Sequence, residues 1–203
     1  MKGFYLVTDG EHSAAGVLSD AARAVEAGTR IIQYRNKTAE TRTLYDEAMS
    51  LKNICAGTGC LFVINDRVDI ALAVDADGVH IGQEDMPYAA ARRLLGAKKI
   101  IGVTVHGVDE AREAESAGAD YLGVSPIFAT ATKADAGAAC GVGTLAAIRR
   151  ACRIPLAAIG GIDLSNVDAV ITAGADMVCA ISAVVSRPDV AGEILKYQGK
   201  FSL

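Results

Sequence analysis

The sequence predicts an α/β protein with a single (β/α)8 TIM barrel, one domain over residues 1–203. Short β-branched runs alternate with longer helical stretches eight times along the chain, a pattern typical of repeated βα units and a parallel sheet. No linker, low-complexity tract or shift in composition divides the chain. An open doubly wound sheet is the structural alternative, but eight successive βα units are more than such a sheet usually needs.

Eight segments are predicted to be strands, because β-branched and other apolar residues cluster in them between turn-forming residues. In chain order they span residues 3–9, 29–35, 60–65, 77–81, 99–105, 119–125, 154–160 and 175–181. A predicted helix follows each strand, over residues 17–27, 40–57, 67–74, 87–95, 108–117, 142–152, 164–173 and 188–198. The segments EAGTRIIQ, VDADGVHI, SAGADYLG and TAGADMVC share one pattern, in which Gly or Asp ends a helix just before a strand.

Composition and charge exclude several classes of protein. The chain is 51% hydrophobic, as an ordinary globular core requires, and its net charge is −4. Because its Lys and Arg residues are scattered, we expect no nucleic-acid or membrane surface. Met1 leads into GFYLVTD without the features of a signal peptide, and the five cysteines form no CxxC pair, so we expect a cytoplasmic protein with free thiols. The sequence leaves open whether the chain forms a homo-oligomer.

Active sites of (β/α)8 barrels lie at the mouth formed by the C-terminal ends of the strands, so the residues that end each strand are the candidates. The second predicted strand ends in QYRNK. Alternate side chains of a strand share a face, so Gln33, Arg35 and Lys37 are predicted to point together into the mouth, where two cations and an amide suit an anion. A solvated strand end with a structural ion pair is the alternative, since burying an arginine is costly.

The stretch NDRVDIALAVDADGVHIGQED has carboxylates near both ends. The third predicted strand ends in Asn65 and Asp66, and the fourth ends near His80, with Asp85 a few residues later. Neighbouring strands of a barrel bring both carboxylates to one rim, next to the basic segment after the second strand. Hard oxygen ligands suit Mg²⁺, and the cations suit the remaining oxygens of a diphosphate that the metal holds. An N-cap role for Asp66 is the alternative.

The fifth and sixth predicted strands end in further polar residues. Thr104 and His106 lie two positions apart and are predicted to share a face. A long polar loop over residues 125–137 follows the sixth strand and carries Thr130, Thr132 and Lys133, which suit an anion-binding flap. A solvated loop is the alternative.

The last two predicted strands end in Gly160-Gly161 and in Ile181-Ser182. Barrels commonly bind phosphate at this place on backbone N–H groups. A monophosphate site here and a diphosphate site at strands 2 to 4 indicate two substrates, or one bisphosphate. Since Mg²⁺ stabilises a diphosphate as a leaving group, a substitution that expels pyrophosphate is the natural reaction.

The segments QYRNK, NDRVDIALAVDADGVHIGQED, GVTVH, ATATK, AIGGI and ISA, in this order and spacing, resemble the thiamine phosphate synthase family along nearly the whole chain. The NDR to GQED block is the most specific, whereas AIGGI occurs in many phosphate-binding barrels. The resemblance implies a transferase of thiamine biosynthesis with Mg²⁺ as cofactor. In that family, 4-amino-2-methyl-5-(diphosphooxymethyl)pyrimidine loses pyrophosphate in a dissociative step, and the nitrogen of 4-methyl-5-(2-phosphoethyl)thiazole attacks its methylene to give thiamine phosphate.

The resemblance also implies the roles of individual residues. Asp66 and Asp85 would ligate Mg²⁺, and Arg35, Thr104 and Lys133 would act in catalysis. The implied substrate-binding residues are Gln33, Tyr34, Arg35, Asn36, Lys37, Asn65, His80, Thr104, Thr130, Ala131, Thr132, Lys133, Gly161, Ile181 and Ser182. The chain departs from the family at Asn36, usually acidic, at Thr104, usually Ser, and at Ala129 and Ala131, where Pro is frequent and its loss predicts a looser flap.

Three other functions remain open. A thiazole tautomerase of the same superfamily uses a His near the end of strand 5, where this chain has His106, but it lacks parts of the diphosphate site that are intact here. A phosphosugar isomerase or epimerase shares the phosphate site, but it needs an acid and base pair and no diphosphate cradle. A non-catalytic ligand-binding barrel would show no Mg²⁺-dependent turnover.

Overall fold

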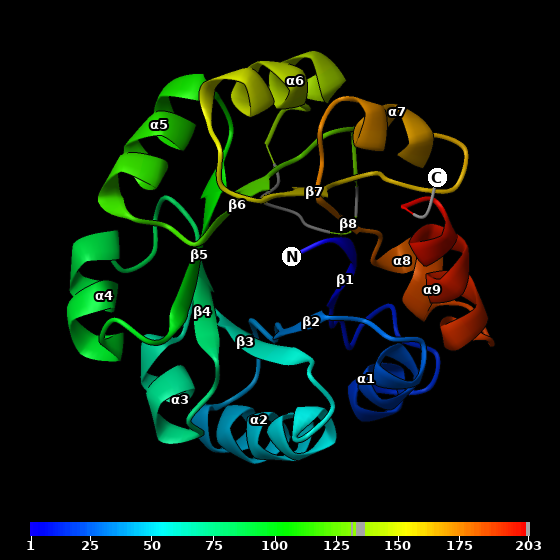
Figure 1. Cartoon of the computed structure of the whole chain (residues 1–203). Coiled ribbons are helices and arrows are strands. Elements are labelled where there is room, and N and C mark those ends of the chain that lie inside the picture. Colours follow the sequence, from blue (N-terminus) through cyan, green and yellow to red (C-terminus); the bar gives the residue numbers. More distant parts are fainter. Residues whose placement is uncertain (131, 133–136, 202–203) are drawn as a thin grey trace.

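The computed structural model describes residues 1–130, 132 and 137–201. Parallel strands close into a barrel in chain order, and β8 pairs with β1 to complete the ring (Figure 1). The strands are β1 (Gly3–Val7), β2 (Ile31–Tyr34), β3 (Leu61–Asn65), β4 (Gly78–Ile81), β5 (Ile100–Val105), β6 (Tyr121–Val124), β7 (Leu156–Ile159) and β8 (Met177–Cys179). The predicted (β/α)8 barrel is confirmed, and each strand lies within its predicted range.

Helices form a ring around the barrel (Figure 1). They are α1 (Val17–Glu26), α2 (Thr41–Cys55), α3 (Val68–Ala73), α4 (Tyr88–Leu95), α5 (Val108–Ala117), α6 (Gly141–Ala151), α7 (Val167–Thr172), α8 (Ser182–Val185) and α9 (Val190–Gly199). The sequence did not predict α8, because its 4 residues are too few to give a periodic signal. None of the helices in the described part of the chain is long and apolar enough to cross a bilayer.

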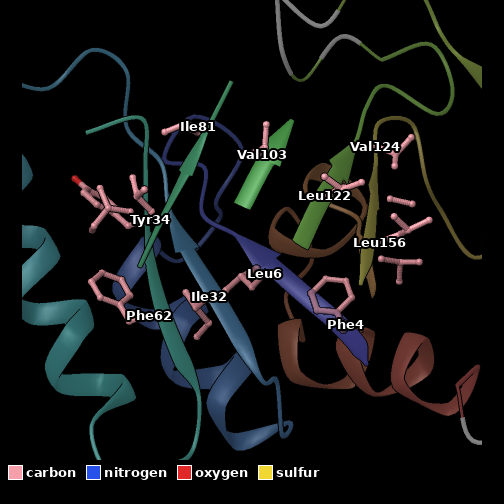
Figure 2. Packing of buried hydrophobic residues seen from close by; sticks show 14 of the residues in the cluster. Phe4, Leu6, Ile32, Tyr34, Phe62, Ile81, Val103, Leu122, Val124 and Leu156 are labelled. Carbon is pink, nitrogen blue, oxygen red and sulfur yellow. The ribbon is translucent and has the colours of Figure 1, made fainter. Parts of the chain in front are cut away.

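Alternation along the strands separates two apolar layers. One layer lies between the strands and the helices, and Figure 2 shows part of it, with Phe4 on β1 and Leu156 on β7. The other lies inside the barrel and contains Tyr5, Val7, Ile31, Val63, Tyr121, Ala157, Met177 and Cys179. Along β2 and β3, the inward apolar residues Ile31 and Val63 come before the inward polar residues Gln33 and Asn65. The apolar layer therefore fills the barrel below the mouth, and polar side chains lie between it and the mouth.

Aspartates directly before β4, β6 and β8 hold neighbouring elements together at the opposite end of the barrel. Asp176, before β8, accepts hydrogen bonds through Oδ2 from the backbone N–H of Leu156 in β7 and from Nη1 of Arg149 in α6, both at 2.9 Å. The same arrangement joins Asp120 to Ile101 and Arg92, and Asp77 to Phe62 and Lys52. These contacts give a physical reason for the repeated sequence pattern before β4, β6 and β8.

Candidate active site

A pocket opens at the mouth of the barrel, and all the strands contribute to its wall. This is the end of the barrel at which active sites of this fold lie. Most of the predicted substrate-binding residues line it: Gln33, Arg35, Asn65, His80, Thr104, Thr130, Thr132, Gly161, Ile181 and Ser182. The structure therefore brings together residues that are far apart in the sequence.

A chain of hydrogen bonds crosses the floor of the pocket from β2 to β5. Gln33 donates through Nε2 to Tyr5 Oη at 2.7 Å, and the hydroxyls of Tyr5 and Tyr121 lie 2.7 Å apart. Tyr121 Oη lies 2.9 Å from His80 Nδ1, and His80 Nε2 lies 2.8 Å from Thr104 Oγ1. The floor thus holds a connected polar network inside an apolar layer.

Tyr5 and Tyr121 are parts of the site that the sequence did not reveal. Both phenols are buried, and this burial raises the pKa of Tyr5 and of Tyr121 well above the ordinary value. Both therefore keep their protons at neutral pH and act as hydrogen-bond donors and acceptors. Burial also raises the pKa of the Cys179 thiol in the same floor, which keeps this cysteine protonated and a poor nucleophile.

The basic segment after β2 meets the carboxylate after β3 at the rim. Lys37 Nζ lies 3.6 Å from Asp66 Oδ2. Asp66 has a backbone φ of 61°, which is uncommon for a residue other than glycine, and its N–H donates to the carbonyl of His80 in β4 at 2.8 Å. Such conformations cluster at functional sites, where the surrounding structure holds them.

Asp85 lies after β4, the neighbouring strand. Its Oδ2 accepts the backbone N–H of Gly82 at 2.6 Å, which orients the carboxylate. Asp85 borders a second hollow that Met86, Tyr88 and Glu110 also line. Among the residues that the structure describes, neither Asp85 nor Asp66 lines the central pocket, so both carboxylates lie outside its wall.

The predicted phosphate site lies across the ends of β7 and β8. Gly160 and Gly161 line the pocket there together with Ile181 and Ser182 at the start of α8. Thr132, from the loop after β6, brings its Oγ1 to 3.2 Å from Ser182 Oγ. Hydroxyls and glycine backbone therefore meet at one side of the mouth, as an anion requires.

The start of the loop after β6 is held by the barrel itself. The backbone N–H of Ile127 donates to the carbonyl of Ile159 at 2.9 Å, and that of Phe128 donates to the carbonyl of Gly160 at 3.0 Å. Thr130 then accepts the N–H of Thr132 at 3.2 Å. The predicted site residues Ala131 and Lys133 lie outside the described residues.

The pocket wall also leaves out four other candidates: Lys37, which pairs with Asp66 at the rim, and Tyr34, Asn36 and His106. Tyr34 points to the helix side of β2, where its hydroxyl donates to Glu47 of α2. Asn36 uses its Oδ1 locally, to accept the backbone N–H groups of Thr38 and Ala39. The ring of His106 contacts Glu110 of α5 at 3.1 Å, and the pocket wall described above does not include it.

The two rim carboxylates can be tested for their fit to Mg²⁺. In the described ranges, no group of three or more His, Cys, Asp or Glu side chains could hold a metal by itself. Mg²⁺ usually takes only one or two carboxylates and completes its octahedron with water and substrate phosphates. Asp66 and Asp85 follow adjacent strands and supply two carboxylates, the number that such a site uses.

Comparison with known proteins identifies the family. The family described as thiamine monophosphate synthase matches residues 4–184. The chain is 54% identical over 194 residues to the thiamine-phosphate synthase of Methanosarcina mazei, covering 96% of this chain and 80% of the relative. It is 47% identical over 197 residues to the thiamine-phosphate synthase of Methanospirillum hungatei, covering 96% and 95%.

A solved structure gives the same result in three dimensions. The thiamine phosphate pyrophosphorylase from Pyrococcus furiosus superposes with a TM-score of 0.90 at 38% identity, covering 98% of this chain and 95% of that one. The family match, the relatives and the solved structure agree, and the chain belongs to the thiamine monophosphate synthase family.

Proposed function

We propose that this protein is a thiamine phosphate synthase that works with Mg²⁺. It joins 4-amino-2-methyl-5-(diphosphooxymethyl)pyrimidine to 4-methyl-5-(2-phosphoethyl)thiazole and releases pyrophosphate. One observation carries the proposal: a single pocket contains a network of polar side chains, the cation Arg35 at one rim, and glycine backbone with hydroxyl groups at the other. Two phosphorylated substrates need such an arrangement, with their reacting atoms between the two anion sites.

The polar floor is the proposed place of the pyrimidine. Gln33 and Thr104 present hydrogen-bonding groups there, and His80 lies between them in the network. An aminopyrimidine carries both N–H donors and ring-nitrogen acceptors, so it can pair with such a floor. A pocket built in this way holds the ring in one orientation, which is a large part of what a catalyst of this substitution must do.

The rim between β2 and β4 is the proposed place of the diphosphate. Arg35 and Lys37 provide the positive charge, with Asn65 beside them, and Asp66 and Asp85 would hold Mg²⁺. When bound, Mg²⁺ withdraws charge from the diphosphate and makes it a better leaving group. Arg35 stabilises the same developing charge through bidentate hydrogen bonds. Lys133, outside the described residues, is proposed to contact the diphosphate too.

The opposite rim is the proposed place of the thiazole phosphate. Ser182 and Thr132 contribute hydroxyl groups, and Gly161 leaves its backbone uncovered by a side chain. Fixing the phosphate here positions the thiazole nitrogen to attack the pyrimidine methylene once its bond to pyrophosphate has broken. Catalysis then comes from orientation and charge stabilisation and requires no nucleophilic side chain.

The tautomerase alternative loses support from the position of His106. Its ring pairs with Glu110, and 47% of its side chain is exposed to solvent. A proton-transfer base must reach the substrate directly or through one water. The cations at the rim have no role in that reaction, whereas the synthase reaction uses them.

The proposed compartment remains the cytoplasm. All five cysteines are free thiols, and free thiols persist in a reducing environment.

The proposal is tested by incubating the purified protein with both phosphorylated substrates and Mg²⁺. We expect thiamine phosphate and pyrophosphate in equal amounts, and no product when a chelator removes the metal. A folded sample that forms neither product contradicts the proposed function, and product formation that is unaffected by the chelator contradicts the role of Mg²⁺.

A further inference from the structure

The hydrogen-bond chain in the floor contains two tyrosines whose role the proposed reaction does not explain. Tyr121 is fully buried between Tyr5 and His80, and its hydroxyl contacts both. Glycines make the space for this arrangement. A side chain at Gly102 would meet the ring of Tyr121 at 2.1 Å, and one at Gly123 would meet the ring of His80 at 2.8 Å.

Counting hydrogens assigns the donor and the acceptor of each hydrogen bond in this network. Each phenol has one hydrogen to donate, and burial keeps that hydrogen in place by raising the pKa of both. Since Gln33 donates to Tyr5, the Tyr5 hydrogen must go to Tyr121. The Tyr121 hydrogen then goes to His80 Nδ1.

The same count continues to the far end of the chain. A neutral imidazole has one acceptor and one donor, so a His80 that accepts at Nδ1 carries its hydrogen on Nε2. That hydrogen goes to Thr104 Oγ1. Thr104 is then left with its own hydrogen for a ligand, while Gln33 is left with its carbonyl oxygen Oε1. Both residues line the pocket.

We propose that Tyr121 is a positioning residue that fixes the His80 tautomer and thereby gives the two ends of the floor opposite polarity. Thr104 is the donor end and Gln33 is the acceptor end. The ligand that matches is an amine-substituted nitrogen heterocycle, which gives a hydrogen to Gln33 and accepts one at a ring nitrogen from Thr104. The identity of this ligand as the aminopyrimidine rests on the proposed function.

The hydrogen-bond network acts as one unit, because reversing one hydrogen bond exchanges donor and acceptor in all the others. If the Gln33 amide turned to accept from Tyr5, then Tyr121, His80 and Thr104 would all reverse, and Thr104 would become an acceptor. Such a floor would suit an oxo-substituted ring in place of an amino-substituted one. Tyr121 therefore acts on specificity without touching the substrate.

Tyr121→Phe tests the proposal, because it removes the hydroxyl and keeps the ring against Gly102. We expect the KM for the pyrimidine diphosphate to rise by about 10- to 100-fold, as when buried partners are left without a hydrogen bond, while the KM for the thiazole phosphate stays unchanged. Tyr197→Phe is the matched control, because Tyr197 is a buried tyrosine of α9 whose ring contacts Phe4 outside the barrel. It should change neither KM.

The His80 tautomer gives a second readout that needs no catalysis. The ¹⁵N resonances of the ring separate a protonated from a bare nitrogen, and their loss in His80→Gln identifies them. We expect a bare Nδ1 and a protonated Nε2 in the wild-type protein, and a mixture of tautomers in Tyr121→Phe. If that variant does not fold, Tyr5→Phe cuts the same chain at its other phenol and should raise the same KM.

Three results would overturn the proposal: a wild-type His80 protonated at Nδ1, an unchanged tautomer in Tyr121→Phe, or equal changes in both KM values. These results differ from a failure of the proposed function. A protein that makes no thiamine phosphate can still show one His80 tautomer in the wild type and a mixture in Tyr121→Phe. In that case, calorimetry measures the affinity for the pyrimidine diphosphate in place of its KM.

Discussion

Lys37 and Asp66 come from the ends of neighbouring strands, β2 and β3, and face each other across 3.6 Å at the rim of the barrel. The pair links a cation of the QYRNK segment to a carboxylate proposed to hold metal. It also places both groups where a diphosphate must lie if its pyrimidine ring occupies the polar floor.

Lys37→Gln tests the cationic half of this rim. We expect the KM for the pyrimidine diphosphate to rise by about 10- to 100-fold, because hydrogen bonds to a charged group are the strong ones, with little change in the KM for the thiazole phosphate. Steady-state kinetics with each substrate varied in turn measures both. Lys196→Gln, in an exposed ion pair with Glu193 on α9, is the control. Equal effects of the two substitutions would argue against a specific role for Lys37.

Ser182→Ala tests the opposite rim. The variant loses a hydroxyl that lies 3.2 Å from Thr132 Oγ1 in the proposed phosphate site. We expect the KM for the thiazole phosphate to rise by about tenfold and that for the pyrimidine diphosphate to stay constant. Ser50→Ala removes a hydroxyl that donates to the carbonyl of Asp46 within α2, and it should alter neither KM. A selective effect on the pyrimidine substrate would reverse our assignment of the two rims.

Asp176→Ala tests the fastening at the other end of the barrel. The Leu156 N–H and the Arg149 guanidinium both lose their acceptor, so the free energy of unfolding should fall by about 1–3 kcal/mol. Denaturant unfolding measures this change. Asp168→Ala removes an exposed carboxylate that pairs with Lys200, and it should cost less than about 0.5 kcal/mol. If both variants lose equal stability, the bond to the strand backbone contributes nothing.

Replacing the buried Asp20 should stabilise the protein by an amount that depends on pH. This residue of α1 is fully buried, and among the described residues no group lies at normal hydrogen-bond geometry to either carboxylate oxygen. Burial raises the pKa of Asp20, and the Ser13 hydroxyl partly offsets this rise. A raised pKa in the folded state means that ionisation opposes folding. The cost is absent below the unfolded pKa of about 3.9, grows as pH rises from there, and is complete above the folded pKa.

Asp20→Val should therefore raise the free energy of unfolding by about 1–3 kcal/mol at neutral pH, because it removes a buried group without partners. The gain should shrink toward the acid end of the range in which the protein folds. Thermal unfolding of both proteins at several pH values measures it. A loss of stability at neutral pH, or a gain that does not vary with pH, would show that the carboxyl has a partner in solution.

The barrel and most of the pocket could be predicted because both follow from local rules. Alternation within a strand gave Gln33 and Arg35 one face, and it also places Tyr34 on the other face, against Glu47. The resemblance implied a role for the whole QYRNK segment and so included Tyr34 with its neighbours. Asn36 was included for the same reason, although a short polar side chain after a strand commonly caps its own loop, as it does here.

The floor of the pocket could not be predicted from the sequence. Tyr5 and Tyr121 stand in apolar strand segments, where a tyrosine is indistinguishable from ordinary core. Their contact depends on the barrel bringing β1 and β6 to opposite sides of one narrow interior. Local pattern carries no information on which inward residues meet across that interior, whereas it does show which residues point inward.

The most direct test of the magnesium-assisted site is a single-turnover measurement of pyrophosphate release in Asp66→Ala and Asp85→Ala, with and without Mg²⁺. Both variants should release pyrophosphate far more slowly than the wild-type protein at the same Mg²⁺ concentration and should still bind the thiazole phosphate. Asp46→Ala, on the exposed face of α2, should behave like the wild type. Wild-type release rates in both rim variants, unchanged by removal of the metal, would contradict the account.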